Sequence, residues 1–280
     1  MTVVEYPDAI HLAREVEPIL ELDPANNTHS LSALKRIFEH GAQHDERFYA
    51  VVEAGDRVVG CAVRVDSKNL FLSVMSHAAA ELLAAHLAIE QIELAGVVGR
   101  RDTVMSFVER YGRDYETHAN LMLYRLEGQP QFGPAPGMSR IATQLHFDQV
   151  LAWYAAFERE VGMIAVPTPL NRRVERRIAD EQVVLWMDHG EPVSMACCNG
   201  LPANSARVGP VYTPPRLRGR GFAQAVTAAA SLHVQRDRAR TVFLFTDALN
   251  PASNRCYQRI GYQYLSDHLH LLFTGDPGTS

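Results

Sequence analysis

The sequence lacks several features that would place the protein in a special class. Its four cysteines show no C-x-x-C spacing of the kind that binds metal, and no apolar stretch reaches the ~18 residues of a membrane span. The net charge of −5 does not favour general binding to nucleic acid or to membranes. The first residues contain neither a basic region nor an apolar run, so we expect no signal peptide. These absences predict a reduced, cytoplasmic protein without a metal.

The chain does have enough length for two domains. At 280 residues each half can bury a core of its own. The clearest interruption of the hydrophobic pattern is "GQPQFGPAPG" at 128–137, which is rich in proline and glycine. We therefore expect an N-terminal domain over 1–127, a linker over 128–137 and a C-terminal domain over 138–280.

The two halves repeat one order of predicted elements. In the first half we expect helices over 8–42 with a break near "LDPANN", a hairpin over 47–65, strands over 69–75, 92–99 and 120–126, and helices over 78–88 and 103–112. In the second half we expect a helix over 147–162, a hairpin over 182–200, strands over 206–213, 241–247 and 268–273, a helix to about 235 and a helix over 252–261. The sequence predicts two similar α/β domains.

The stretch "TPPRLRGRGFAQA" indicates a turn that binds an anion. Its two prolines end a strand, and an apolar pattern of helical spacing follows. Gly219 and Gly221 allow backbone conformations that a Cβ would block, so amide groups could gather at the helix N-terminus. Arg216, Arg218 and Arg220 add positive charge there. The alternative is an ordinary strand-to-helix turn with solvated arginines.

Two further segments carry unusual residues. In "RVGPVYT", Gly209 and Pro210 interrupt a strong strand and predict a bulge, which would leave backbone groups facing a cleft for an extended, amide-containing ligand. In "NPASNRCYQRIGY", we expect a helix with Ser253 as its N-cap and Gly261 at its end. Tyr257 lies in the middle of this helix, where it is either functional or a packed aromatic.

Together these segments resemble the GNAT superfamily of acyl-CoA-dependent N-acyltransferases. The family's pyrophosphate motif is Gln or Arg, two residues, Gly, one residue, then Gly or Ala, and Arg216 to Gly221 match it. Its later motif is matched by Asn250, Tyr257 and the pair Gly261–Tyr262. The resemblance is specific over 185–273 and diffuse over 1–127. It implies tandem GNAT-like domains, each with a mixed, mostly antiparallel sheet flanked by helices.

The resemblance also implies that only the C-terminal domain is catalytic. The first half has "MSHAAAELLAA" in place of the glycine turn, and Arg101 and Val108 stand where Asn250 and Tyr257 stand in the second. It therefore resembles a degenerate copy without an acyl-CoA site.

The family's site residues can be carried over one by one. The backbone of Val211 and Thr213 would contact the pantetheine arm and the thioester carbonyl, and Asn250 would contact the pantetheine. Tyr257 would lie near the sulfur and protonate the departing thiolate. The pyrophosphate would bind within the motif that begins at Arg216, on the amides of Arg218, Gly219, Arg220, Gly221 and Phe222.

The sequence departs from the family at the general base. Phe245, Arg207 and Gly209 stand where members carry a glutamate. Asp247 is the nearest carboxylate, and it is a base acting through water, an anchor for the amine, or a cap of the following turn.

The implied function is transfer of an acetyl group from acetyl-CoA to a primary amine of a small molecule or peptide, by direct attack of the amine on the thioester. The alternative is a non-catalytic sensor or scaffold that binds acyl-CoA. No metal, nucleic acid or membrane partner is implied, and a homodimer is one assembly that the sequence allows.

Overall fold

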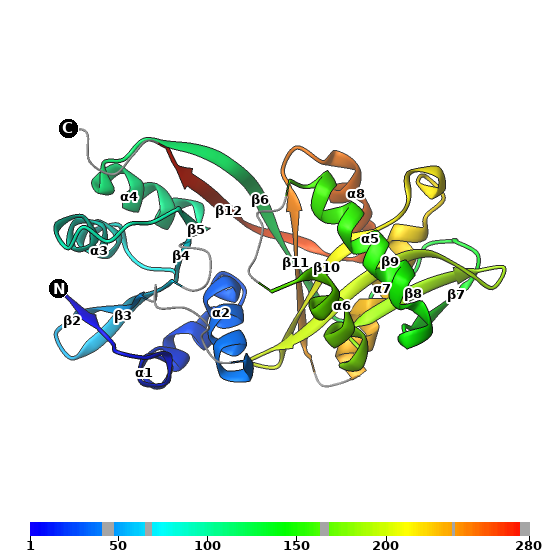
Figure 1. The fold of residues 1–280 in the computed structure, drawn as a ribbon, viewed down its shortest axis with the longest axis horizontal. Coiled ribbons are helices and arrows are strands. Elements are labelled where there is room, and N and C mark those ends of the chain that lie inside the picture. The colour runs from blue at the N-terminus through cyan, green and yellow to red at the C-terminus, as the bar shows by residue number, and fades with distance from the viewer. Residues whose placement is uncertain (41–47, 65–68, 163–167, 237–238, 275–280) are drawn as a thin grey trace. The chain divides into compact units, whose positions relative to one another are not determined.

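One order of helices and strands occurs twice along the chain (Figure 1). The computed structural model describes residues 1–40, 48–64, 69–162, 168–236 and 239–274. The first copy contains β1 (Thr2–Glu5), α1 (Ala9–Leu22), α2 (Thr28–His40), β2 (Phe48–Ala54), β3 (Arg57–Arg64), β4 (Asn69–Leu72), α3 (His77–Ile89), β5 (Gly96–Arg100), α4 (Arg101–Tyr111) and β6 (Tyr115–Glu127). The second contains β7 (Met138–Ile141), α5 (Phe147–Glu160), α6 (Leu170–Ala179), β8 (Val183–Asp188), β9 (Glu191–Leu201), β10 (Ser205–Tyr212), α7 (Phe222–Arg236), β11 (Thr241–Asp247), α8 (Pro251–Ile260) and β12 (Gln263–Phe273). The predicted tandem α/β fold is confirmed.

The chain forms two compact units whose boundaries differ from those expected. Unit 1 contains Met1–Leu123 together with Ser266–Ser280, and unit 2 contains Tyr124–Leu265. The expected linker at 128–137 lies inside unit 2. There the Trp186 Nε1 group donates a hydrogen bond to the Pro136 carbonyl at 2.7 Å, and the Gln131 N–H donates to the Ile260 carbonyl at 2.9 Å. These contacts make the segment a packed part of unit 2.

Each unit takes one strand of its sheet from the other copy of the repeat. In unit 1 the strands run in the order β1-β2-β3-β4-β5-β12, and Leu272 to His268 of β12 pair antiparallel with β5. In unit 2 the order is β7-β8-β9-β10-β11-β6. Both strand orders are mixed. β4 pairs parallel with β5 and β10 pairs parallel with β11, whereas the pairs β1–β2, β2–β3, β3–β4, β5–β12, β7–β8, β8–β9 and β9–β10 are antiparallel.

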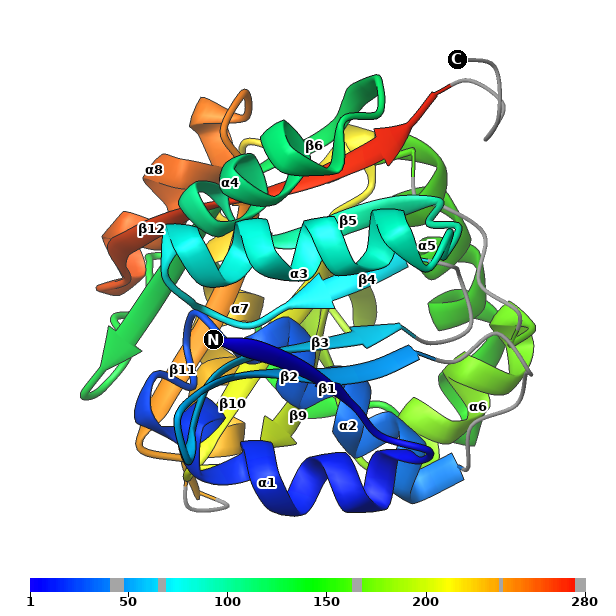
Figure 2. The ribbon, with the colours of Figure 1, turned by 90° about the vertical axis from the view of Figure 1, so that its left-hand side faces the viewer.

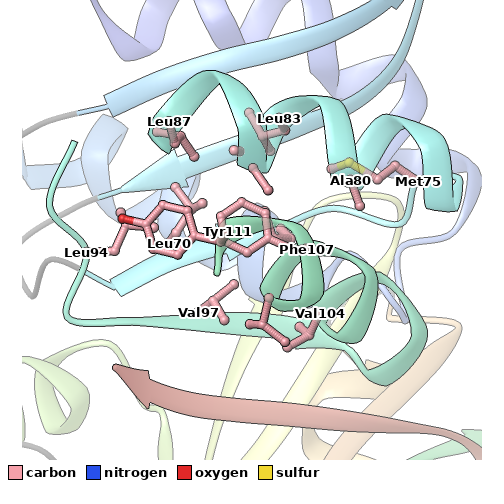
Figure 3. Close-up of a cluster of buried hydrophobic side chains, with 14 of the residues drawn as sticks. Leu70, Met75, Ala80, Leu83, Leu87, Leu94, Val97, Val104, Phe107 and Tyr111 are labelled. Atoms are coloured by element: carbon pink, nitrogen blue, oxygen red, sulfur yellow. The ribbon is translucent and has the colours of Figure 1, made fainter. Parts of the chain in front are cut away.

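Alternating side chains of the unit 1 strands fill two cores. Ala50 and Val52 of β2 join α3 and α4 in one cluster, whereas Tyr49 and Val51 join α1 and α2 in the other. The helix pairs therefore cover opposite faces of the sheet, as Figure 2 shows for α3 and α1. In the first cluster Phe107 and Leu83 are fully buried (Figure 3). Each such side chain stabilises the fold by about 1.5–3 kcal/mol relative to its exposed state.

The sheet of unit 2 is covered in a similar way by α5 and α6 on one face. Trp153 and Tyr154 of α5 and Val174 of α6 pack against side chains of β8 and β9. Tyr212, at the end of β10, belongs to the same cluster, and its ring lies 6.3 Å from that of Trp153. This packing fixes the end of β10, from which the glycine turn continues.

Candidate active site

The strands β10 and β11 pair over only part of their lengths. Ser205–Arg207 pair with Thr241–Phe243, and β10 then continues to Tyr212 while β11 continues to Asp247. On its other edge β10 pairs with β9, and the register shifts between Val208 and Val211. The bulge predicted at Gly209 and Pro210 is therefore confirmed. It lies directly after Arg207, the last residue of β10 that pairs with β11.

Three side chains hold the end of β10. The Ser194 hydroxyl of β9 donates to the Tyr212 carbonyl at 3.0 Å and lies 2.8 Å from the Thr213 hydroxyl. The Arg218 Nε group donates to the Thr213 carbonyl at 2.8 Å. The same guanidinium forms an ion pair with Glu160 at the end of α5, with Nη2 at 2.9 and 2.7 Å from the two carboxylate oxygens. Sequence reasoning missed Ser194 and Glu160, since neither belongs to a motif.

The segment after β10 forms the expected glycine turn. A short 3₁₀ helix at Pro215–Leu217 precedes it, and α7 begins at Phe222. Gly219 and Gly221 have φ values of +77° and +83°, which residues other than glycine rarely adopt. A Cβ placed on Gly219 would meet no atom within 4 Å, so a ligand could approach the backbone there.

The amides of this turn suit an anion. The Arg218 N–H donates to the Pro215 carbonyl at 3.3 Å, so it is already engaged. Within the part of the chain that the structure describes, no hydrogen bond is found for the amides of Gly219, Arg220, Gly221 and Phe222. Free amides at a helix N-terminus carry partial positive charge and can bind phosphate oxygens.

The three arginines of the turn lie in different environments. Arg218 is committed to Glu160 and Thr213. Arg220 lies 3.9 Å from the Asp188 carboxylate, and its Cζ atom is 5.0 Å from the centre of the Phe222 ring. Arg216 is exposed. Arg216 and Arg220 are therefore better placed than Arg218 to offer their charge to a ligand.

Asn250 is the N-cap of α8. Its Oδ1 atom accepts from the Ser253 N–H at 3.1 Å, and Pro251 occupies the first turn. The predicted N-cap Ser253 is thus wrong: Asn250 caps the helix, because Pro251 takes the first helical position and the cap is the residue before it. The amide group of Asn250 still has its two N–H donors for a ligand.

Tyr257 is buried in the middle of α8. Its side chain is 9% exposed, and its ring centre lies 6.3 Å from that of Tyr262. Burial raises the pKa of the Tyr257 phenol, a neighbouring thiol of Cys256 raises it further, and a hydrogen bond with Ser253 lowers it in part. The phenol is protonated at neutral pH, as it would be at its ordinary pKa of about 10. The predicted C-cap is confirmed, because Gly261 ends α8 in the left-handed conformation.

Comparisons with known proteins identify the fold and the domain. Residues 147–262 match the family model described as "Acetyltransferase (GNAT) family". These residues form a GNAT acetyltransferase domain. No curated protein matches the chain in sequence.

Solved structures resemble the whole chain at low sequence identity. A GCN5-related N-acetyltransferase from Sphaerobacter thermophilus is 17% identical, with a TM-score of 0.63 over 97% of this chain and 95% of that one. A GNAT-family acetyltransferase from Colwellia psychrerythraea is 12% identical, with a TM-score of 0.61 over 98% and 100%. A tandem GNAT protein from the clavulanic acid biosynthesis pathway is 13% identical, with a TM-score of 0.57 over the full length of both chains. The fold is thus a tandem GNAT fold.

The GNAT domain offers one carboxylate near the end of β11. Asp247 is exposed, and its Oδ1 atom accepts from the Leu249 N–H at 2.8 Å, which is the contact expected of a turn cap. His233 of α7 lies 3.1 Å from the Glu181 carbonyl, in a structural contact. Among the described residues, no group of three or more His, Cys, Asp or Glu side chains could hold a metal.

The corresponding turn of unit 1 lacks glycine. There Ser76 caps α3, with its hydroxyl 3.3 Å from the Ala79 N–H, and His77 lies 2.6 Å from the Ser106 hydroxyl. In the described ranges, no helix is long and apolar enough to cross a membrane.

Proposed function

We propose that unit 2 transfers an acetyl group from acetyl-CoA to a primary amine of a small molecule or peptide. The observation that carries this proposal is the path of the chain from Thr213 to Phe222 within a GNAT acetyltransferase domain. In this segment the end of β10 leads directly into amides that suit an anion. A ligand with an extended arm and a pyrophosphate matches both features.

The donor would bind along this segment. The amides of Gly219, Arg220, Gly221 and Phe222 would hold the pyrophosphate, with added charge from Arg216 and Arg220. This set omits the Arg218 amide that the family resemblance implied, because the Arg218 N–H already donates to the Pro215 carbonyl. The backbone of Val211 and the amide group of Asn250 would hydrogen-bond the pantetheine arm.

The chemistry follows from the groups at the end of β10 and on α8. When the amine attacks the thioester carbon, negative charge grows on the carbonyl oxygen, and the Thr213 N–H would stabilise it. As the bond from carbon to sulfur breaks, Tyr257 would donate its proton to the leaving thiolate.

The amine must also lose a proton. Asp247 is our candidate for its acceptor, through a water molecule, because its Oδ1 atom binds the Leu249 N–H and Oδ2 remains for a second contact. Phe245, Arg207 and Gly209 occupy the positions where family members carry a glutamate, so a glutamate base at those strand positions is not expected.

Turnover of acetyl-CoA with a panel of primary amines tests the proposal. Release of free CoA thiol that depends on an amine, with the matching acetylated product by mass spectrometry, would support it. Tight binding of acetyl-CoA without thiol release for any amine would instead favour the non-catalytic sensor or scaffold. The lack of a glutamate at positions 207, 209 and 245 is the sequence feature that favours this alternative.

A further inference from the structure

The ion pair between Arg218 and Glu160 does more than join a turn to a helix. Arg218 reaches the Thr213 carbonyl with Nε at 2.8 Å while its Nη2 group binds both oxygens of Glu160. The guanidinium therefore connects α5, the glycine turn and the end of β10 through one rigid fork. The two side chains are 48% and 44% exposed, and ion pairs that exposed add little to folding stability.

Both peptide groups that flank Thr213 are fixed. The carbonyl before it, from Tyr212, accepts from the Ser194 hydroxyl, and its own carbonyl accepts from Arg218. A trans peptide directs its C=O and N–H groups to opposite sides, so the Thr213 N–H points away from Ser194. Ser194 lies on β9, whereas β10 has already passed its last pair with β11 on the other edge. The Thr213 N–H is thus held toward the edge where a ligand would bind.

We propose that Arg218, supported by Glu160, is a positioning residue: it holds the peptide group after Thr213, and so fixes Thr213 with its N–H directed at the thioester carbonyl of the acyl donor. This inference rests on the function proposed above. It assigns the Arg218 side chain to the acyl group and not to the phosphates, although Arg218 lies inside the phosphate-binding motif. The reason for this assignment is that the Arg218 guanidinium already binds the Thr213 carbonyl and the Glu160 carboxylate.

The variants Arg218→Lys and Glu160→Gln test this role. Lysine keeps the positive charge but cannot form the fork, and glutamine removes the carboxylate charge that holds Arg218. In both variants we expect kcat to fall at least about tenfold through misplacement of the Thr213 N–H. The Kd for free CoA should change by less than about twofold, because the amides proposed to bind the pyrophosphate are unchanged in both variants.

A second measurement does not depend on turnover. If the Thr213 N–H contacts the thioester oxygen, the protein should bind acetyl-CoA more tightly than CoA, and Arg218→Lys should abolish that preference. The pair Arg173 and Glu158 supplies matched controls, since it joins α6 to α5 with an N–O distance of 2.7 Å and does not contact Thr213. Arg173→Lys and Glu158→Gln should leave both kcat and the preference unchanged.

Two results would overturn the inference. Weaker binding of CoA by Arg218→Lys with tighter binding by Glu160→Gln would show that Arg218 contacts phosphate. Unchanged kcat and preference in both variants would reduce the ion pair to a surface contact. The wild type tests the proposed function separately: acetyl-CoA binding without turnover would contradict acetyl transfer. A preference for acetyl-CoA over CoA that the wild type shows and Arg218→Lys loses would still support the positioning role.

Discussion

Gly221 lies against Ala135, in the segment that the sequence suggested to be a linker. A Cβ placed on Gly221 would be 3.4 Å from the Ala135 Cβ, whereas one placed on Gly219 would meet nothing within 4 Å. The two glycines of the turn therefore have different surroundings. Gly219 faces open space, whereas a Cβ on Gly221 would make an ordinary van der Waals contact with segment 128–137.

Substitution of Gly221 should nevertheless impair binding of the acyl donor. Gly221→Val would strain a backbone with φ of +83° and displace the phosphate-binding amides, so acetyl-CoA binding should weaken by about 1–3 kcal/mol or more. Calorimetry checks the affinity, and Gly200→Ala is the control, because a Cβ there meets nothing within 4 Å. Unchanged affinity in a folded Gly221→Val protein would contradict the proposal that this turn binds the pyrophosphate.

Tyr257→Phe should lower kcat by roughly 10²–10⁴-fold with little effect on the affinity for acetyl-CoA, if the phenol protonates the thiolate. Tyr262→Phe is the control, since the Tyr262 hydroxyl is also buried but lies 2.7 Å from the Ser231 hydroxyl. That variant should lose stability and keep its kcat. Equal kcat in wild type and Tyr257→Phe, with chemistry rate-limiting, would return Tyr257 to a packed aromatic.

Titration of the intact chain should give one acetyl-CoA per protomer. The turn of unit 1 has no glycine, and Ser76 already caps α3, so a pyrophosphate finds no backbone to approach. Isothermal calorimetry measures the stoichiometry directly. A value of two would show that unit 1 kept a working site.

The protein should lose stability as the pH falls from about 6.5 toward 4, in part through His268. Burial lowers the pKa of His268 to about 4, and Arg100 lowers it too, against Asp23, Asp102 and Asp267. Below about 6.5 the unfolded chain takes up a proton that the folded one refuses, so the free energy of unfolding falls with pH.

Urea denaturation at pH 7 and pH 4.5 measures this loss. His268→Gln should show a smaller loss than the wild type, because glutamine does not titrate. An equal loss in both proteins would contradict the assignment. His270, whose pKa burial also lowers to about 4, provides a second variant of the same kind.

The sequence predicted most elements because their patterns are local. Each hairpin turn at Gly55 or Gly190 and the helix end at Gly112 depends on a glycine with positive φ. The turn before α7 depends in the same way on its own two glycines. α6 was overlooked, although Val174 and Ile178 are spaced one turn apart and are buried, because four arginines hid the apolar face. The short edge strands β1 and β7 offered too few residues for a pattern.

Candidate site residues could be proposed from the sequence only where a motif contained them. Gly219, Gly221, Asn250 and Tyr257 belong to spaced motifs, whereas Glu160 comes close to Arg218 only through folding, 58 residues away in sequence. The exchange of β6 and β12 was also beyond local reasoning, because strand order depends on which edge each segment reaches. Segment 128–137 looked like a linker for the same reason.

The exchange of strands has a consequence for synthesis of the chain. β12 is translated after every residue of unit 2, yet its segment from Ser266 completes the sheet of unit 1 beside β5. During translation β5 of unit 1 therefore has no partner on one edge until β12 has been made. Unit 2, in contrast, has all its residues once Leu265 has left the ribosome. Unit 2 can thus finish folding before unit 1, which precedes it in the chain.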